Sequence, residues 1–74
     1  MPGQRVNGEA LRAIRERTGF NIPQFADAIG IGASHLSLVE RGQRNVSPQV
    51  LDRMATVLGV PKAALLRFDV EAVA

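Results

Sequence analysis

The chain has no cysteine, no tryptophan and no tyrosine, and only one histidine among its 74 residues. Without cysteine, neither a disulfide nor a thiolate metal site can stabilise so short a chain. No apolar run is long enough to predict a membrane span, and the N-terminal residues do not resemble a signal peptide. We therefore expect a single cytoplasmic domain that is stabilised by apolar packing.

The composition and the spacing of apolar residues favour an all-α fold. Hydrophobic residues make up 46% of the chain, enough for a small core, and helices pack compactly at this length. Cap and turn residues divide the chain into helical segments with no convincing strand. The five segments expected are about 9–17, 22–29, 33–41, 48–58 and 61–67.

Residues 22–41 carry the most informative pattern. Apolar side chains recur there at helical spacing on two short segments, and Gly30 lies where the first helix must end. A glycine can adopt the positive φ that reverses the chain at this point. The inward set is Phe25, Ala26, Ile29, Leu36 and Val39. Two helices joined by such a turn form the helix-turn-helix unit of DNA-binding proteins.

With Leu36 and Val39 directed inward, the opposite face of helix 33–41 is expected to point outward. If this helix enters the major groove, the residues predicted to meet base edges are Ala33, Ser34, Ser37 and Leu38. Phosphate contacts are predicted from the free N–H groups behind the cap residue Asn21 and from polar side chains around the loop 42–46. These DNA-backbone residues are Asn21, His35, Arg41, Gln43, Arg44 and Asn45.

Two structural alternatives compete with these assignments. His35 lies at the border of the inward face of its helix, where a histidine can be a boundary residue without a binding role. Ser34, Ser37 and Arg41 can equally form a solvated face, with Leu38 part of a small interface.

Positive charge gathers in the part of the chain that holds the helix pair. Through Arg44 there are six arginines and four acidic residues, whereas three basic and three acidic residues follow. This imbalance suits a nucleic-acid partner, although mild basicity alone is weak evidence. Scattered carboxylates and serines without an adjacent base argue against catalysis, so we expect no enzyme, no cofactor and no metal site.

The chain resembles the Cro/CI-type, or XRE-type, helix-turn-helix regulators typified by phage repressors. The resemblance rests on LRAIRERTGF, NIPQFADAIGIGASHLSLVERGQRNVSP and LDRMATVLGVPKAALL. It implies a compact five-helix, lambda-repressor-like domain with the helix-turn-helix at helices 2 and 3. The expected divisions are an N-terminal arm over 1–8, the DNA-binding domain over 9–68 and a C-terminal tail over 69–74.

The resemblance also implies an internal ion pair between Arg15 and Glu40 that ties helix 33–41 to the first helix. The alternative is an exposed Arg15 that binds phosphate. The chain departs from the family at Ile22, where glutamine is frequent, and its presumed reading face is poor in long hydrogen-bonding side chains. Bidentate base contacts are therefore scarce.

The leading hypothesis is a sequence-specific double-stranded DNA-binding transcriptional regulator, a repressor acting at a pseudo-palindromic operator. It would be cytoplasmic and nucleoid-associated when bound. A weak or DNA-induced homodimer is expected through Phe68, Val70 and Val73. The alternative is a protein-interaction module, such as an antitoxin or accessory factor, that uses Leu38 and the apolar tail residues against a protein partner.

Overall fold

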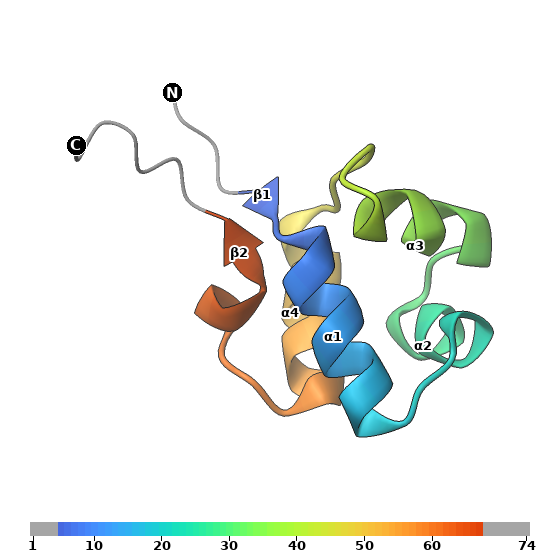
Figure 1. Ribbon diagram of the computed structural model, residues 1–74, viewed down its shortest axis with the longest axis horizontal. Helices are drawn as coiled ribbons and strands as arrows, with labels where there is room; N and C mark the ends of the chain where they lie inside the picture. The colour runs from blue at the N-terminus through green and yellow to red at the C-terminus, as the bar shows by residue number, and fades with distance from the viewer. Residues whose placement is uncertain (1–4, 68–74) are drawn as a thin grey trace.

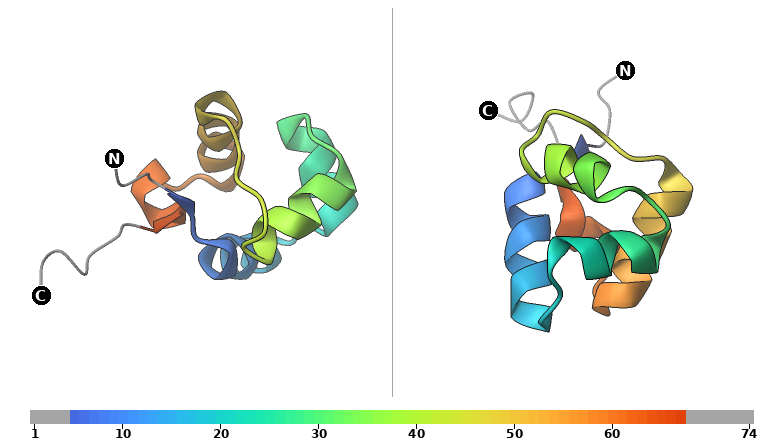
Figure 2. Two further views of the ribbon diagram at one scale, coloured as in Figure 1. Left: turned by 90° about the horizontal axis from the view of Figure 1, so that it is seen from above. Right: turned by 90° about the vertical axis from the view of Figure 1, so that its right-hand side faces the viewer.

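The computed structural model describes residues 5–67 of the chain. In order, its elements are β1 (Arg5–Val6), α1 (Gly8–Thr18), α2 (Ile22–Ile29), α3 (Ala33–Glu40), α4 (Pro48–Leu58), the 3-10 helix η1 (Lys62–Leu65) and β2 (Leu66–Arg67) (Figure 1). Figure 1 and Figure 2 show α2 and α3 on one side of α1 and α4. Within residues 5–67, no helix is both long and apolar enough to cross a bilayer.

The four α-helices begin and end where the sequence predicts, to within one residue. Three of them begin at a side chain that accepts a hydrogen bond from the first turn, and three end at a glycine with positive φ. The capping side chains belong to Asn7, Asn21 and Ser47. α3 lacks such a cap, because Gly32 precedes it. Local sequence therefore sets the limits of these helices.

The fifth helix expected over 61–67 is not an α-helix. Residues Lys62–Leu65 form one 3-10 turn after Pro61, and Leu66 is extended, with φ −106° and ψ 147°. Leu65 is fully buried, whereas the next two residues pair with β1. The segment stops being helical because pairing with β1 satisfies its backbone better than another helical turn would.

A two-stranded antiparallel sheet that the sequence did not predict joins the two ends of the described chain. Arg5 lies opposite Arg67 and Val6 opposite Leu66. The N–H of Asn7 also donates to the carbonyl of Leu65, over 2.8 Å. Residues 5–8, assigned to an N-terminal arm from the sequence, thus belong to the packed body. Residues 1–4 and the tail residues Phe68, Val70 and Val73 lie outside the described residues.

The core lies where α1, α2, α3, α4 and η1 meet. It contains the inward residues expected for the helix pair together with Leu11, Met54 and Leu65, all fully buried. Phe20 packs on Phe25 with ring centroids 5.6 Å apart. Val6, which was not expected in the core, is also buried because β1 packs against the core.

The first turn of α1 lies directly against the last turn of α3. A Cβ atom added at Gly8 would overlap the carbonyl oxygen of Glu40 and lie 2.7 Å from that of Val39. The carbonyl end of α3 thus faces the amide end of α1, an arrangement that their dipoles favour. This close approach requires glycine at position 8 and fixes the end of α3 on α1.

Candidate nucleic-acid interface

The helix pair predicted from residues 22–41 is present as α2 and α3. Phe25, Ile29 and Leu36 are fully buried between the two helices and the rest of the core. Gly30 has φ 79°, and its N–H donates to the carbonyl of Ala26 over 2.9 Å. The chain reverses at this point and places α3 across α2, at the surface of the molecule in Figure 2. The scaffold of a helix-turn-helix unit is therefore confirmed.

The four residues predicted to read bases lie on α3 but differ in exposure. Ala33 and Ser34 are exposed, whereas Ser37 and Leu38 are half-buried. The Oγ of Ser37 accepts a hydrogen bond from Arg41 Nη2 over 3.2 Å, and the carbonyl of Leu38 accepts one from the N–H of Gln43 over 2.9 Å. All four residues therefore keep some exposed surface, and the first two are the most accessible.

Arg15 and Glu40 form the ion pair that the family resemblance implies. Arg15 Nε lies 2.6 Å from Glu40 Oε2, and Nη2 lies 3.0 Å from Oε1, so the contact is bidentate. Arg15 Nη1 donates to the carbonyl of Phe20 over 2.8 Å. The two side chains are only 6% and 5% exposed. The alternative of an exposed, phosphate-binding Arg15 is therefore wrong.

The hydrogen bonds to Glu40 raise the pKa of Arg15 above its ordinary value, against an opposing effect of burial. Arg15 thus stays charged, and the pair holds the last residue of α3 on α1.

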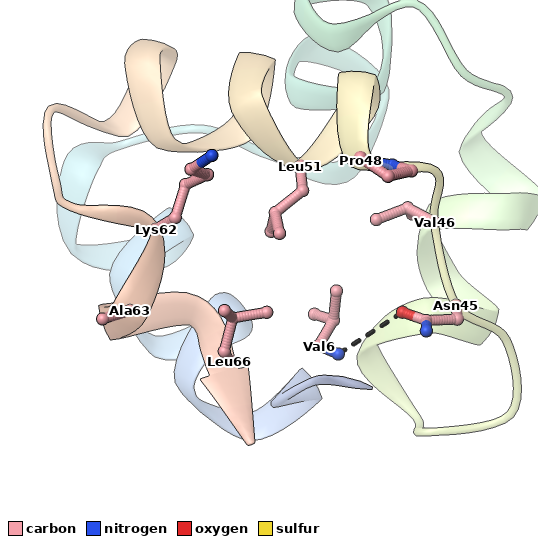
Figure 3. A pocket seen from close by; sticks show the side chains of 8 residues that line it. All are labelled: Val6, Asn45, Val46, Pro48, Leu51, Lys62, Ala63 and Leu66. Carbon is pink, nitrogen blue, oxygen red and sulfur yellow. Dashed lines mark hydrogen bonds between the residues drawn. The ribbon is translucent and has the colours of Figure 1, made fainter. Parts of the chain in front are cut away.

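Two predicted phosphate contacts, His35 and Asn45, also have bonds within the fold. Nε2 of His35 lies 3.3 Å from the carbonyl oxygen of Asn45, so this nitrogen must carry the donated proton. Oδ1 of Asn45 accepts a hydrogen bond from the N–H of Val6 over 3.3 Å, drawn as a dashed line in Figure 3. The loop between α3 and α4 is therefore attached to both α3 and β1. Arg41, Gln43 and Arg44 are exposed around it.

The first turn of α2 has fewer free donors than expected. The N–H of Gln24 donates to Asn21 Oδ1 over 2.8 Å, and Gln24 Oε1 accepts from the N–H of Asn21 over 3.0 Å. The N–H of Phe25 donates to the carbonyl of Asn21, and Pro23 has no N–H. Of the donors in this turn, the Ile22 N–H and the side-chain amide nitrogens of Asn21 and Gln24 remain for an anion.

A family model described as a helix-turn-helix domain matches residues 8–68 of this chain. The chain belongs to the helix-turn-helix family. Its resemblance to Cro/CI-type regulators is confirmed by this match and by named relatives. One is the HTH-type transcriptional repressor RghR of Bacillus subtilis, 35% identical over 60 residues, which cover 80% of this chain and 44% of the repressor.

Two solved structures share this helix-turn-helix domain. The restriction-modification controller protein C.AhdI from Aeromonas hydrophila is 35% identical, with a TM-score of 0.72 over 77% of this chain and 86% of the controller. The biofilm master regulator SinR, a protein of Bacillus subtilis, was solved in complex with DNA. It is 29% identical, with a TM-score of 0.71 over 77% of this chain and 95% of that one. The chain spans only 22% of a Thermococcus kodakarensis relative and 44% of RghR.

The helix-turn-helix domain also has a cavity of mixed polarity that the sequence did not reveal. It has a volume of about 360 Å³ and lies between β1, the loop before α4, α4 and η1 (Figure 3). Aliphatic side chains such as Leu51 and Leu66 point into it, and Lys62 stands at its edge, 2.8 Å from Asp52. No pattern along the chain could have indicated this cavity, because its walls come from three stretches that are far apart in the sequence: Val6, residues 45–51 and residues 62–66.

Replacing Asn45 by alanine is expected to loosen this loop of the helix-turn-helix domain. The substitution leaves the N–H of Val6 without its acceptor, which costs about 1 kcal/mol of unfolding free energy. Hydrogen exchange at the Val6 amide should accelerate while exchange in α2 stays slow. The exposed neighbour Gln43→Ala is the control; equal exchange in both variants would contradict a role for Asn45 in holding β1.

Proposed function

We propose that this domain is a sequence-specific double-stranded DNA-binding transcriptional regulator that inserts α3 into the major groove. The observation that carries the proposal is the placement of α3: its inner side is anchored in the core, and Ala33 and Ser34 at its N-terminal end are exposed. The N-terminal part of such a helix is the part that meets base edges. The likeness to SinR, solved with DNA, supports the same partner.

The proposed reading face offers small and apolar groups. Ala33 and Leu38 suit contact with thymine methyl groups, and Ser34 and Ser37 can make permissive hydrogen bonds with bases. Because none of these four side chains can form a bidentate bond to a base, the shape and deformability of the DNA would contribute to the choice of site.

The proposed backbone contacts surround this face. Arg41, Gln43 and Arg44 are exposed near the C-terminal end of α3 and are assigned to phosphates. Asn21 would act through its amide nitrogen, since its oxygen caps α2. His35 and Asn45, bonded to each other through the loop backbone, remain phosphate contacts in this proposal and also hold the loop in place.

The proposal extends to repression from a pseudo-palindromic operator in the cytoplasm, bound by two copies of the chain. Half-sites one turn apart, about 34–36 Å, would then match the two-fold axis of the pair. The tail residues Phe68, Val70 and Val73 are proposed to contribute to a weak or DNA-induced dimer. Deleting residues 69–74 should reduce cooperative binding to a two-site duplex; unchanged cooperativity would contradict this part.

A titration with duplexes selected from a random pool, repeated over a salt series, tests the function. Log affinity should fall linearly with log salt, and Arg44→Ala should reduce the slope by about 0.9, the value for one phosphate contact. Affinity should fall equally for all sequences, because a phosphate contact carries no base preference. Lys62→Ala on η1 is the matched control and should change neither quantity.

Two outcomes would overturn the proposal. The first is an absence of selected sequences together with binding that does not depend on salt. The second is a stable protein partner recovered with the full chain that binds the α3 face while no duplex does, which would favour the protein-interaction module.

A further inference from the structure

A second cavity lies beside the proposed reading face, where α1, the start of α2 and the end of α3 meet. Its volume is about 290 Å³. Three of the residues around it are arginines: two lie on α1 and one directly follows α3. The lining residues are Arg12, Arg15, Ile22, Ser37, Glu40 and Arg41.

The inner wall of this cavity is already neutralised. Arg15 and Glu40 bind each other through two hydrogen bonds, and the third bond of Arg15 goes to a backbone carbonyl. Of the other two arginines, Arg12 pairs with Glu16, which does not line the cavity, so Arg41 is the source of the net positive charge. The cavity is open to solvent on one side, and its protein walls make this charge act on an anion more strongly than it would on a flat surface.

Arg12 and Arg41 both keep donors free for an anion. Arg12 is 64% exposed and uses Nε to bind Glu16 Oε2 over 3.1 Å, which leaves its two terminal nitrogens available. Arg41 is held beside the cavity by the bond from Nη2 to Ser37 Oγ, which leaves Nε and Nη1. Ile22, whose N–H is also unused in the first turn of α2, lines the same cavity. Converging guanidinium groups are the usual partners of phosphate oxygens.

We propose that this cavity holds one phosphate group of the DNA backbone, bound by Arg12 and Arg41, with Glu16 as its competitor. The proposal rests on the proposed function and adds to it a contact from α1. For a phosphate to bind, the Arg12 guanidinium must turn from the Glu16 carboxylate to the phosphate oxygens. Glu16 therefore weakens DNA binding. Its carboxylate also lies 3.9 Å from Arg15 Nη2, a second cation near it when Arg12 turns away.

The test is a salt series in which a selected duplex is titrated with the wild type and with three single variants. Arg12→Ala should lower affinity by about five- to tenfold near physiological salt and reduce the salt slope by about 0.9. Glu16→Gln should raise affinity about two- to fivefold, because the free energy of the exposed ion pair with Arg12 no longer opposes DNA binding. Arg17→Ala, an exposed arginine of α1 that does not line the cavity, is the matched control and should keep the wild-type slope.

The double variant Arg12→Ala with Glu16→Gln separates competition from the general effect of charge. If Glu16 acts by occupying Arg12, the double variant binds like Arg12→Ala alone. If removal of Glu16 raises affinity just as much in the absence of Arg12, long-range charge is responsible and the competition is refuted. Circular dichroism of every variant should show wild-type unfolding to within a few degrees, since Arg12 and Glu16 are exposed.

Inorganic phosphate tests whether the cavity binds a free phosphate ion instead of a phosphate group of the DNA backbone. Perturbation of the Arg12 Nε signal in nuclear magnetic resonance by low millimolar phosphate, with an unchanged DNA salt slope in Arg12→Ala, would indicate a free-anion site and overturn the proposal. Equal slopes for Arg12→Ala and Arg17→Ala on a duplex that the wild type binds steeply would refute this inference alone. No salt-dependent binding by the wild type would refute the proposed function as well.

Discussion

Replacing Glu40 by alanine is expected to lower the unfolding free energy by about 3–5 kcal/mol, because it leaves the buried Arg15 guanidinium without its partner. Arg15 remains charged, and no water can reach it freely at 6% exposure. The same substitution removes the side-chain link between the last turn of α3 and α1 and leaves only the backbone contact at Gly8. Denaturant unfolding followed by circular dichroism measures the change, and amide exchange in α3 should rise with it.

The exposed pair between Lys62 and Asp52 is the control for this prediction. The two side chains are 56% and 60% exposed, so Asp52→Ala should cost no more than about 1 kcal/mol. Replacing both members of the buried pair, with Arg15→Met and Glu40→Leu, should recover much of the loss because no unpaired charge remains. A loss from Glu40→Ala no larger than that from Asp52→Ala would show that the buried pair does not anchor α3.

The second large effect is expected at Gly8. Gly8→Ala places a methyl group against the carbonyl oxygens of Val39 and Glu40, which are backbone atoms and cannot move aside as a side chain could. We expect a loss near the upper end of the range for overpacking, about 3 kcal/mol. In a domain of this size each 1 kcal/mol shifts Tm by roughly 4–8 °C, so thermal unfolding should show the effect clearly.

Gly32→Ala is the matched control for Gly8→Ala. Gly32 also lies at the start of a helix, but its φ of −73° suits any residue and no atom lies within 4 Å of an added Cβ. The substitution should cost less than about 1 kcal/mol, through the weaker capping of α3. Similar losses in the two variants would mean that helix propensity, rather than the contact between α1 and α3, makes glycine necessary at position 8.

The sequence predicted the helices well because their limits depend on local chemistry. Asn21 and Ser47 cap the helices that follow them, and Gly30 takes a conformation that most other residues avoid. The period of the apolar residues then identified Phe25 and Leu36 as core. These signals lie within one or two turns of the residues they concern, so a single sequence carries them.

The elements that the sequence missed depend on distant partners. Two-residue strands are too short for any alternation, and Val6 is extended where it pairs with Leu66 and buried where it packs on the core. The same pairing ended the expected fifth helix after one 3-10 turn. One such feature has a local signal: Asn21 followed three residues later by Gln24 is a capping box, which engages the N–H of Gln24 behind the cap.

The candidate site was predicted in outline and less well in detail. Helical geometry placed the proposed base-reading residues on α3, but it could not show that Ser37 and Leu38 would be half-buried there. It also could not bring Asn45 to His35 on one side and to Val6 on the other. Such contacts follow the path of a loop, and the path of a loop is set by the whole fold.

The pairing of β1 with β2 brings the two ends of the described chain to adjacent positions. The Cα atoms of opposite residues in an antiparallel pair lie only about 5 Å apart, so Arg5 and Arg67 start and finish almost at the same place. A domain whose two ends lie side by side can be inserted into a surface loop of a host protein without distorting the domain or the host. It can likewise be circularly permuted, with a short linker joining its ends and new termini opened in an exposed turn such as that at Gly19.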